Sequence, residues 1–178
     1  MKKHLEIGGY QVDVPTVIAL VESPYESLQN LGIKILTILS DPNKSKIGNY
    51  EQQFENYIKQ INELTLQRNK KQEFVNNTLK TVSNLALKDS IRPHIIHHKG
   101  IEILLAHLRN DQNVEGQRIS AKGLLNLSIG SRDIKMRIVG ELAEEIQLMH
   151  KNEIDSIVYG YIQTLLVSKD NKKDFPDI

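Results

Sequence analysis

The chain has 178 residues, 39% of them apolar and 25% charged, and its 23 lysine and arginine residues are nearly balanced by 22 aspartate and glutamate residues. A chain of this length can bury one substantial core, and the balanced charge gives no overall basic excess for binding nucleic acid or a membrane surface. There is no cysteine, which excludes disulfides, thiolate metal ligands and a cysteine nucleophile.

Apolar residues recur at helical spacing along almost the whole chain, separated by short polar segments that often contain proline or glycine. The first helix is predicted at 14–20 and the second at 25–40, where Pro42 ends it because proline cannot continue the hydrogen-bond ladder. Further helices are predicted at 50–66, 72–87, 101–109, 114–129, 142–150 and 153–168, with short helices within 88–100 and at 133–139. The predicted class is all-α, followed by a polar tail at 169–178.

The apolar stripes also predict which side chains face inward. The second helix is expected to bury five apolar residues: Leu28, Leu31, Ile35, Leu36 and Leu39. Gly100 and Gly140 each follow a short helix. We expect both to turn the chain there, because glycine commonly ends a helix.

A period of about 40 residues runs through this pattern. Four apolar residues near helix ends share one register, with spacings of 46, 42 and 40 residues: Leu39, Leu85, Leu127 and Val167. A leucine stands 19 positions before each of them. Such a period is typical of stacked helical repeats, so we predict one domain of residues 1–168, with repeats at 1–41, 42–88, 89–130 and 131–168.

The unit consists of a short helix, a glycine, an apolar helix, a polar turn and a long helix that ends in Leu-Asn-Leu. It resembles the armadillo repeat, and the match is carried by GIEILLAHLRNDQNVEGQRISAKGLLNLS at 100–128 and by TLKTVSNLAL at 78–87. Residues 17–40 fit more loosely, and the fourth copy fits by register. The HEAT repeat is the nearest alternative, but its units usually have two helices. The resemblance implies a right-handed α-solenoid of about four repeats.

In the armadillo family the third helices line a concave groove that binds extended peptides, often through asparagine side chains. The resemblance therefore implies a non-catalytic protein scaffold or adaptor, with Asn84 and Asn126 at the matching positions. The tryptophan that completes the basic-signal pocket of the family's nuclear-import adaptors is missing, because this chain has no tryptophan. Lys80 and Lys122 stand four residues before the asparagines, on the same helix face, and Lys34 takes the equivalent position in the first repeat.

Three lysines along one groove would repel a basic signal and attract an acidic, extended segment of a protein partner. Glu73, Glu115 and Arg118 make the groove mixed in charge, and a solvated helix face with lysines that serve solubility is the alternative interpretation. The predicted groove has seven members: Lys34, Asn76, Lys80, Asn84, Arg118, Lys122 and Asn126.

The last repeat breaks the lysine and asparagine pattern with Ile162 and Leu166. We expect an apolar face there that packs against something else, such as another subunit. The alternative function is therefore that of a permanently bound accessory subunit in a large multiprotein complex.

No constellation in the sequence predicts an enzyme, a cofactor or a metal site. His94, His97 and His98 lack a supporting carboxylate or cysteine, and an exposed short helix accounts for them. There is no phosphate-binding loop or nucleophile elbow, and no aromatic residues are interleaved with the basic clusters, so nucleic acid is not an expected partner. The apolar runs are too short to span a membrane. The expected location is the cytoplasm, with an organelle or cytoskeletal assembly as the alternative.

Overall fold

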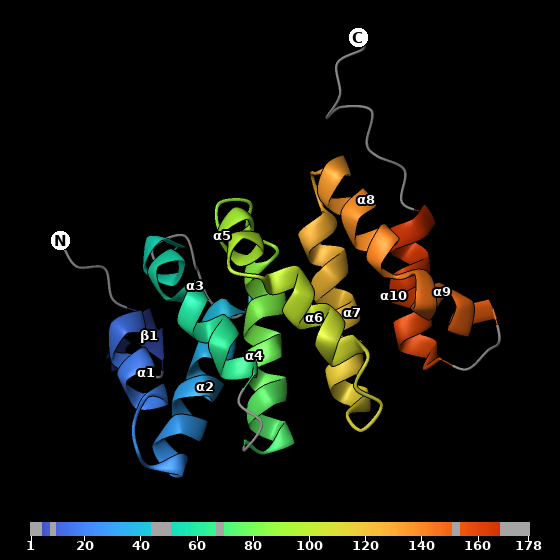
Figure 1. Cartoon of the computed structure of the whole chain (residues 1–178). Helices are drawn as coiled ribbons and strands as arrows, with labels where there is room; N and C mark the ends of the chain where they lie inside the picture. Colours follow the sequence, from blue (N-terminus) through green and yellow to red (C-terminus); the bar gives the residue numbers. More distant parts are fainter. Residues whose placement is uncertain (1–4, 8–9, 44–50, 67–69, 151–153, 168–178) are drawn as a thin grey trace, which may run out of the picture.

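The computed structural model describes residues 5–7, 10–43, 51–66, 70–150 and 154–167. Within these ranges the chain forms a short hairpin and ten helices, drawn in Figure 1. The elements are β1 (Leu5–Ile7), β2 (Tyr10–Val12), α1 (Val14–Val21), α2 (Glu26–Ser40), α3 (Glu51–Thr65), α4 (Gln72–Leu85), α5 (Arg92–His97), α6 (Gly100–Leu108), α7 (Val114–Ser128), α8 (Arg132–Glu141), α9 (Ala143–His150) and α10 (Ser156–Val167). The predicted helical class is confirmed, and each predicted helix has a counterpart close to its expected position.

The hairpin ahead of α1 is an addition to the predicted elements. Its two strands pair antiparallel, with Leu5 opposite Val12 and Ile7 opposite Tyr10. Each strand has three residues. That is too few to establish the alternation with a period of two by which strands are identified in a sequence.

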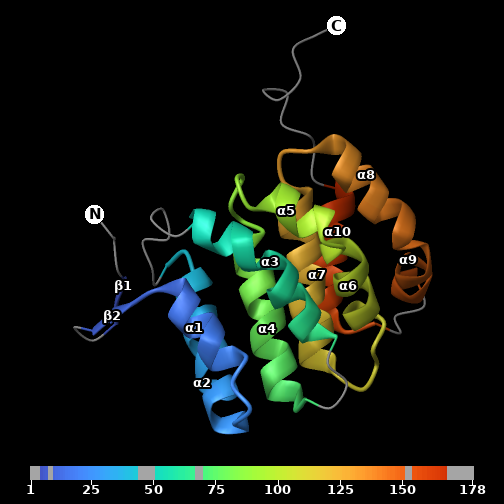
Figure 2. The same cartoon turned by 60° about the vertical axis from the view of Figure 1, so that its left-hand side comes forward.

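The helices are arranged around one row. Four helices, α2, α4, α7 and α10, lie side by side, each in contact with the next, and we call them the inner helices (Figure 1). A second layer covers them: α1, α3 and α6 pack on α2, α4 and α7 respectively, and α8 contacts both α7 and α10. The short α5 joins this layer by contacting α3 and α6 (Figure 2). The stack therefore has α1 and α2 at one end and α8 to α10 at the other.

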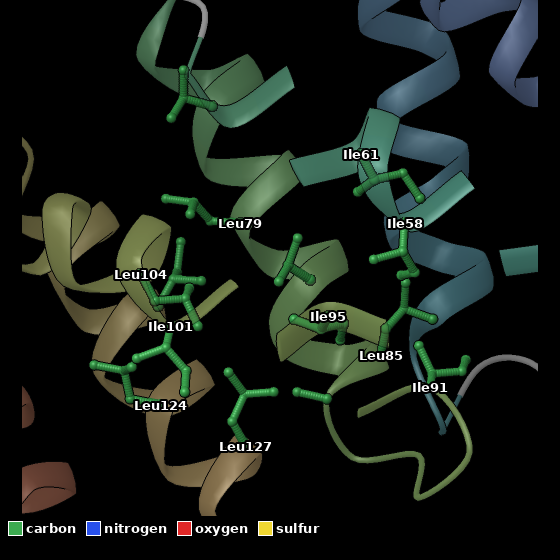
Figure 3. Close-up of a cluster of buried hydrophobic side chains, with 14 of the residues drawn as sticks. Ile58, Ile61, Leu79, Leu85, Ile91, Ile95, Ile101, Leu104, Leu124 and Leu127 are labelled. Atoms are coloured by element: carbon green, nitrogen blue, oxygen red, sulfur yellow. The ribbon is translucent and has the colours of Figure 1, made fainter. Parts of the chain in front are cut away.

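One continuous hydrophobic core runs between the two layers. In its central part, shown in Figure 3, isoleucine and leucine side chains from α3 through α7 are at most 1% exposed: Ile58, Ile61, Leu79, Leu85, Ile91, Ile95, Ile101, Leu104, Leu124 and Leu127. Each helix buries an apolar stripe against its neighbours. Successive helices therefore depend on one another for their core.

The last inner helix has a register different from the predicted one. The three earlier anchor leucines are buried as expected, whereas Val167 is 69% exposed. The buried residue at this end of α10 is Leu165, two positions earlier, and Ile162 is buried as well. Ile162 therefore packs in the chain's own core and not on the predicted apolar face toward another subunit, whereas Leu166 is exposed. The α10 sequence SIVYGYIQTLLV is apolar on nearly every side, so its periodicity does not fix which stripe faces the core.

The first inner helix also departs from its predicted inward face. Leu28 and Leu31, expected in the core, are 36% and 49% exposed, whereas Leu36 and Leu39 are buried as predicted. Ile33, which was not predicted to face inward, is fully buried. Within the described residues no inner helix precedes α2, so the stripe that carries Leu28 and Leu31 lacks a neighbour.

The two glycines after the short helices have roles different from the predicted turns. Lys99 takes the left-handed conformation, with φ of 63°, and Gly100 is the first residue of α6. A Cβ atom at Gly100 would lie 2.3 Å from Cγ2 and 2.7 Å from the carbonyl oxygen of Ile95. By contrast, α8 continues through Gly140 to Glu141, and a Cβ atom at Gly140 would meet nothing within 4 Å. Gly100 is required by close packing, and Gly140 is not.

This contrast predicts opposite effects for the same substitution at the two positions. Gly100→Ala is expected to lower the free energy of unfolding by about 1–3 kcal/mol, because the Ile95 backbone must shift to admit the methyl group. Gly140→Ala is expected to raise it by about 0.5–1 kcal/mol, because alanine favours the helix and has room. Urea titration followed by circular dichroism measures both values. Equal effects at the two sites would contradict the packing described here.

Candidate functional site

A groove of about 410 Å³ lies across the inner helices. Each residue that lines it belongs to an inner helix or directly follows one: Thr37, Asp41, Lys80, Ser83, Asn84, Glu115, Arg118, Ile119, Lys122, Ile157 and Tyr161. Four of the seven predicted groove residues meet here: Lys80, Asn84, Arg118 and Lys122. They come together because α4 and α7 pack side by side.

The two asparagines that were expected to hold a peptide have different surroundings. Asn126 is 6% exposed, and its Nδ2 donates a hydrogen bond to the carbonyl oxygen of Ser83 at 2.8 Å, which links α7 to α4. Asn84 lines the groove, and its Nδ2 makes a longer contact of 3.3 Å with Oγ of Ser40. Among the described residues, none donates a hydrogen bond to Oδ1 of Asn84. Asn126 therefore connects helices, while Asn84 keeps a free acceptor at the groove.

Asn76 and Lys34 also lie outside the groove lining. Oδ1 of Asn76 accepts a hydrogen bond from Nδ2 of Asn113 at 2.8 Å. Asn113 in turn caps α7 by accepting a hydrogen bond from the backbone N–H of Gly116 at 3.0 Å. Lys34 pairs with Glu73 on the next inner helix. Both predicted groove residues thus tie neighbouring helices together.

The predicted groove cations Lys34, Lys80 and Arg118 each form an ion pair toward the next inner helix, with Glu73, Glu115 and Asp155 at nitrogen-to-oxygen distances of 2.9, 3.2 and 2.8 Å respectively. Lys122 forms no ion pair with any described residue, because Arg118, one turn earlier on α7, makes the link toward α10. The expected row of three lysines available to a ligand is therefore reduced to one unpaired lysine beside partly exposed pairs.

Asp155, the partner of the groove residue Arg118, is the residue that sequence reasoning missed. Its carboxylate accepts hydrogen bonds from Nε and Nη2 of Arg118 at 3.1 and 2.8 Å. The same carboxylate caps α10 through the backbone N–H groups of Ile157 and Val158. The Arg118 hydrogen bond, with those of the two N–H groups, lowers the pKa of Asp155 from 3.8 to about 2. An aspartate just ahead of an apolar helix is an N-cap signal, but it carries no information about Arg118.

This lowered pKa predicts how acid affects stability. Because the folded-state pKa lies below the unfolded value of 3.8, the contribution of Asp155 is complete above pH about 4 and is lost as the pH falls through about 2. Arg118→Gln is expected to move the pKa of Asp155 back toward 3.8, measured by NMR titration of its carboxyl carbon. Glu102→Gln, which alters an exposed pair with Arg137, is the control and should leave that pKa unchanged. A pKa of Asp155 that stays near 2 in Arg118→Gln would contradict the assignment.

The groove combines charge with apolar surface. Ile119 in the lining is buried, whereas Ile157 on α10 is 46% exposed. The half-buried Tyr161 lies one helical turn after Ile157. Lys122 and the open acceptor of Asn84 supply polar contacts on the same surface. Such a surface can bind an extended chain through backbone hydrogen bonds, a carboxylate and an apolar side chain.

A separate hollow of about 480 Å³ lies among α3, α5 and α6, and His97 and His98 are in its lining. Nδ2 of the buried Asn62 donates to the carbonyl oxygen of His98 at 3.0 Å. Burial lowers the pKa of His98, which favours its neutral form near pH 7. Across the described ranges, no three His, Asp or Glu side chains are grouped so as to hold a metal ion. In the same ranges, no helix has the length and apolar character needed to cross a bilayer.

Comparisons with known proteins bear on the fold. No protein-family model matches the chain, and no curated protein matches it in sequence. Two solved structures of engineered proteins, both from the Northeast Structural Genomics Consortium, are similar in fold. The first has a TM-score of 0.69 and 20% identity and covers 88% of this chain; the second has a TM-score of 0.70 and 16% identity and covers 92%. This chain spans 62% of the first protein and 68% of the second. The likeness supports the helical architecture and carries no functional information.

Proposed function

We propose that the chain is a right-handed armadillo-type solenoid that acts as a non-catalytic protein-binding module. Its ligand is an extended, acidic segment of a partner protein, and its site is the groove across the inner helices. The observation that carries the proposal is that Lys122, which pairs with no described residue, lies in the same groove as Oδ1 of Asn84, to which no described residue donates.

The lining holds three cations, Lys80, Arg118 and Lys122, against two carboxylates, Asp41 and Glu115, and this excess supports an acidic segment over a basic one. Lys122 offers an ammonium group that forms no ion pair with any described residue. Lys80 is engaged by Glu115 at 3.2 Å, but both side chains of the pair are more than 40% exposed. Exposed pairs of this kind contribute little, so a ligand carboxylate can exchange with Glu115 at small cost. One ligand carboxylate thus binds Lys122, and a second competes for Lys80.

The remaining contacts fit an extended backbone with one apolar side chain. Oδ1 of Asn84 accepts a hydrogen bond from a peptide N–H group of the ligand. The exposed Ile157, with Tyr161 beside it, receives an apolar ligand residue at the α10 side of the groove. Of the seven residues predicted from sequence, the proposed ligand contacts keep three: Lys80, Asn84 and Lys122. Ile157 and Tyr161 of α10 are added to them.

Peptides of matched length and apolar content, made acidic, neutral or basic, provide the test. Fluorescence anisotropy is expected to show binding of the acidic set, weakening as salt is added. Lys122→Glu should raise the dissociation constant at least about tenfold, because an attractive charge becomes a repulsive one. Glu115→Gln should lower the constant, because it removes the internal competitor for Lys80.

Lys59→Glu on α3 is the matched control, because it makes the same charge change at a side chain that is 67% exposed and outside the groove. Its dissociation constant should stay within about twofold of wild type. Equal binding of the three peptide sets, or equal weakening by Lys59→Glu and Lys122→Glu, would exclude the groove as an acidic-peptide site.

A permanently bound accessory subunit of a multiprotein complex is the second candidate function. The observation that favours it is the exposed apolar surface of α10, where Tyr159, Leu166 and Val167 are 37%, 38% and 69% exposed. A subunit held through that end would be recovered in one stoichiometric complex, and recovery would be insensitive to Lys122→Glu.

A further inference from the structure

The helices α2, α4 and α7 each use one side to contact the next inner helix, and we call this side, and the equivalent side of α10, the forward face. On α2, Oγ1 of Thr37 donates to the carbonyl oxygen of Asn77 on α4 at 2.9 Å. On α4, the Ser83 carbonyl accepts from Asn126 on α7. Thr37 and Ser83 are each flanked, one helical turn before and one after, by forward-face residues that are at most 8% exposed. These are Ile33 and Ser40 on α2 and Leu79 and Ala86 on or just after α4, and the equivalent residues of α7 are Ala121 and Ser128.

The forward face of α10 breaks this pattern. When α10 is aligned with α7 on their buried leucines, Leu165 and Leu127, Tyr159 of α10 corresponds to Ala121 and Leu166 corresponds to Ser128. Tyr159 and Leu166 are 37% and 38% exposed, because no further inner helix follows α10 within the described residues. They are also larger and more apolar than the alanine and serine at these positions of α7. The forward face of α10 therefore presents two apolar side chains at positions that are buried in the earlier inner helices, with the exposed, polar Gln163 between them.

The opposite side of α4, α7 and α10 contacts the preceding inner helix, and we call this side, and the equivalent side of α2, the rear face. On α4 it includes Thr81 and Asn84, which contact Thr37 and Ser40 of α2 at 3.1 and 3.3 Å. The equivalent positions of α2 carry large apolar residues: Leu31, Ile35 and Ile38. Leu31 and Ile38 are 49% and 38% exposed, at the end of the stack opposite α10 (Figure 1). Among the described residues, nothing thus covers the rear face of α2 at one end or the forward face of α10 at the other.

We propose that a second copy of this chain stacks end to end on the first, with the forward face of α10 against the rear face of α2 of the other copy. Every junction within the chain joins a forward face to a rear face, so a second copy carries the face that each end lacks. The α10 sequence has no charged residue, so its burial requires no desolvation of a charge. Ends of helical stacks that stay in water are usually polar, whereas these two ends expose Leu31, Ile38, Tyr159 and Leu166.

The contact is heterologous, because different surfaces of the two copies meet, and it leaves one open face at each end of the pair. It extends the row of inner helices from one copy to the next. Because the groove lies across the inner helices, stacking also extends the surface that carries it, and a ligand can then contact both copies. The proposal does not depend on the groove being a peptide site, because it rests on residues of the end faces alone.

Two single substitutions separate the two faces. Leu31→Glu places a charge on the rear face of α2, and Leu166→Glu places one on the forward face of α10. Both side chains are more than a third exposed, so each variant is expected to fold with the same helical content as wild type. Leu66→Glu, at a 54% exposed leucine that belongs to neither face, is the control. Sedimentation equilibrium over a range of protein concentrations measures the mass.

Wild type and Leu66→Glu are expected to associate as concentration rises. Leu31→Glu or Leu166→Glu alone should shift association to a concentration at least about tenfold higher, because an unpaired carboxylate would be buried. An equimolar mixture of the two variants should form a dimer and stop there, because each supplies the intact face that the other has lost. A Leu31→Glu variant that still dimerises alone would show a symmetric contact between two α10 faces and overturn the proposal. Wild type that stays monomeric up to about 1 mM would overturn it as well.

Discussion

Replacing Leu127 with alanine is expected to lower the free energy of unfolding by about 2–5 kcal/mol. The Leu127 side chain is fully buried in α7, one turn after Leu124, in the cluster drawn in Figure 3. Truncation removes buried methyl groups and leaves a cavity. The helices around α7 are held in place by their own neighbours, so they cannot move in to fill it. Urea titration followed by circular dichroism, in dilute solution, measures the loss. Leu127 is a sensitive site because α7 contacts both α4 and α10, so its packing supports two junctions at once.

The matched control tests the register of α10. Val167→Ala alters the residue that shares the predicted sequence register of Leu127, but Val167 is 69% exposed and should change stability by no more than about 0.5 kcal/mol. Leu165→Ala, at a residue that is 1% exposed, should cost about as much as other buried leucines. A large loss in Val167→Ala together with a small one in Leu165→Ala would reverse the register described here.

Helix positions were predictable because they depend on local signals. Pro42 follows the end of α2, polar residues separate α6 from α7, and the stripe of Val75, Leu79 and Val82 repeats at helical spacing. The inward face was predictable only for helices whose other sides are polar. In α10 the apolar residues continue around the helix, and in α2 the stripe of Leu28 and Leu31 is apolar without being covered. Both errors fall on the two ends of the stack, where tertiary neighbours and not periodicity decide burial.

The groove was partly predictable for the same reason. A spacing of four residues does place Lys80 and Asn84 together at the groove, but the same spacing fails for Lys122 and Asn126, because Asn126 is buried against α4. Which cations remain unpaired depends on how far each inner helix is shifted along its axis relative to its neighbour. A single sequence does not reveal this shift. Glu115 therefore neutralises Lys80, while Arg118 finds Asp155 and leaves Lys122 free of an ion pair among the described residues.

Replacing Arg92 with alanine is the second substitution with a large expected effect. Arg92 is 9% exposed and stands at the start of α5. Its Nε donates to the carbonyl oxygen of Ala86 at 2.9 Å, just after α4 ends, and its Nη1 donates to the carbonyl oxygen of Ile129, just after α7 ends. The last carbonyl groups of a helix have no partner within the helix, and a cation at that end is favourable. One guanidinium group thus satisfies the ends of two successive inner helices.

Arg92→Ala is expected to lower the free energy of unfolding by about 2–4 kcal/mol, because two partly buried carbonyl groups lose a charged donor. Arg92→Lys should recover only part of this loss, since a single ammonium group does not reproduce the planar fork that reaches both carbonyls. Amide hydrogen exchange should report the damage at the ends of α4 and α7 before the rest of either helix, because those are the groups that Arg92 holds.

Asp89 distinguishes the carbonyl contacts from the ion pair. Nη2 of Arg92 also pairs with Oδ1 of Asp89, but the Asp89 side chain is 92% exposed. Asp89→Asn is therefore expected to change stability by less than about 1 kcal/mol, as exposed pairs usually do. If Asp89→Asn cost as much as Arg92→Ala, the ion pair would be the source of stability. If both were neutral, the two helix ends would be satisfied by water. A large loss confined to Arg92→Ala means that α4 and α7 are joined at their ends through one side chain from the helix between them.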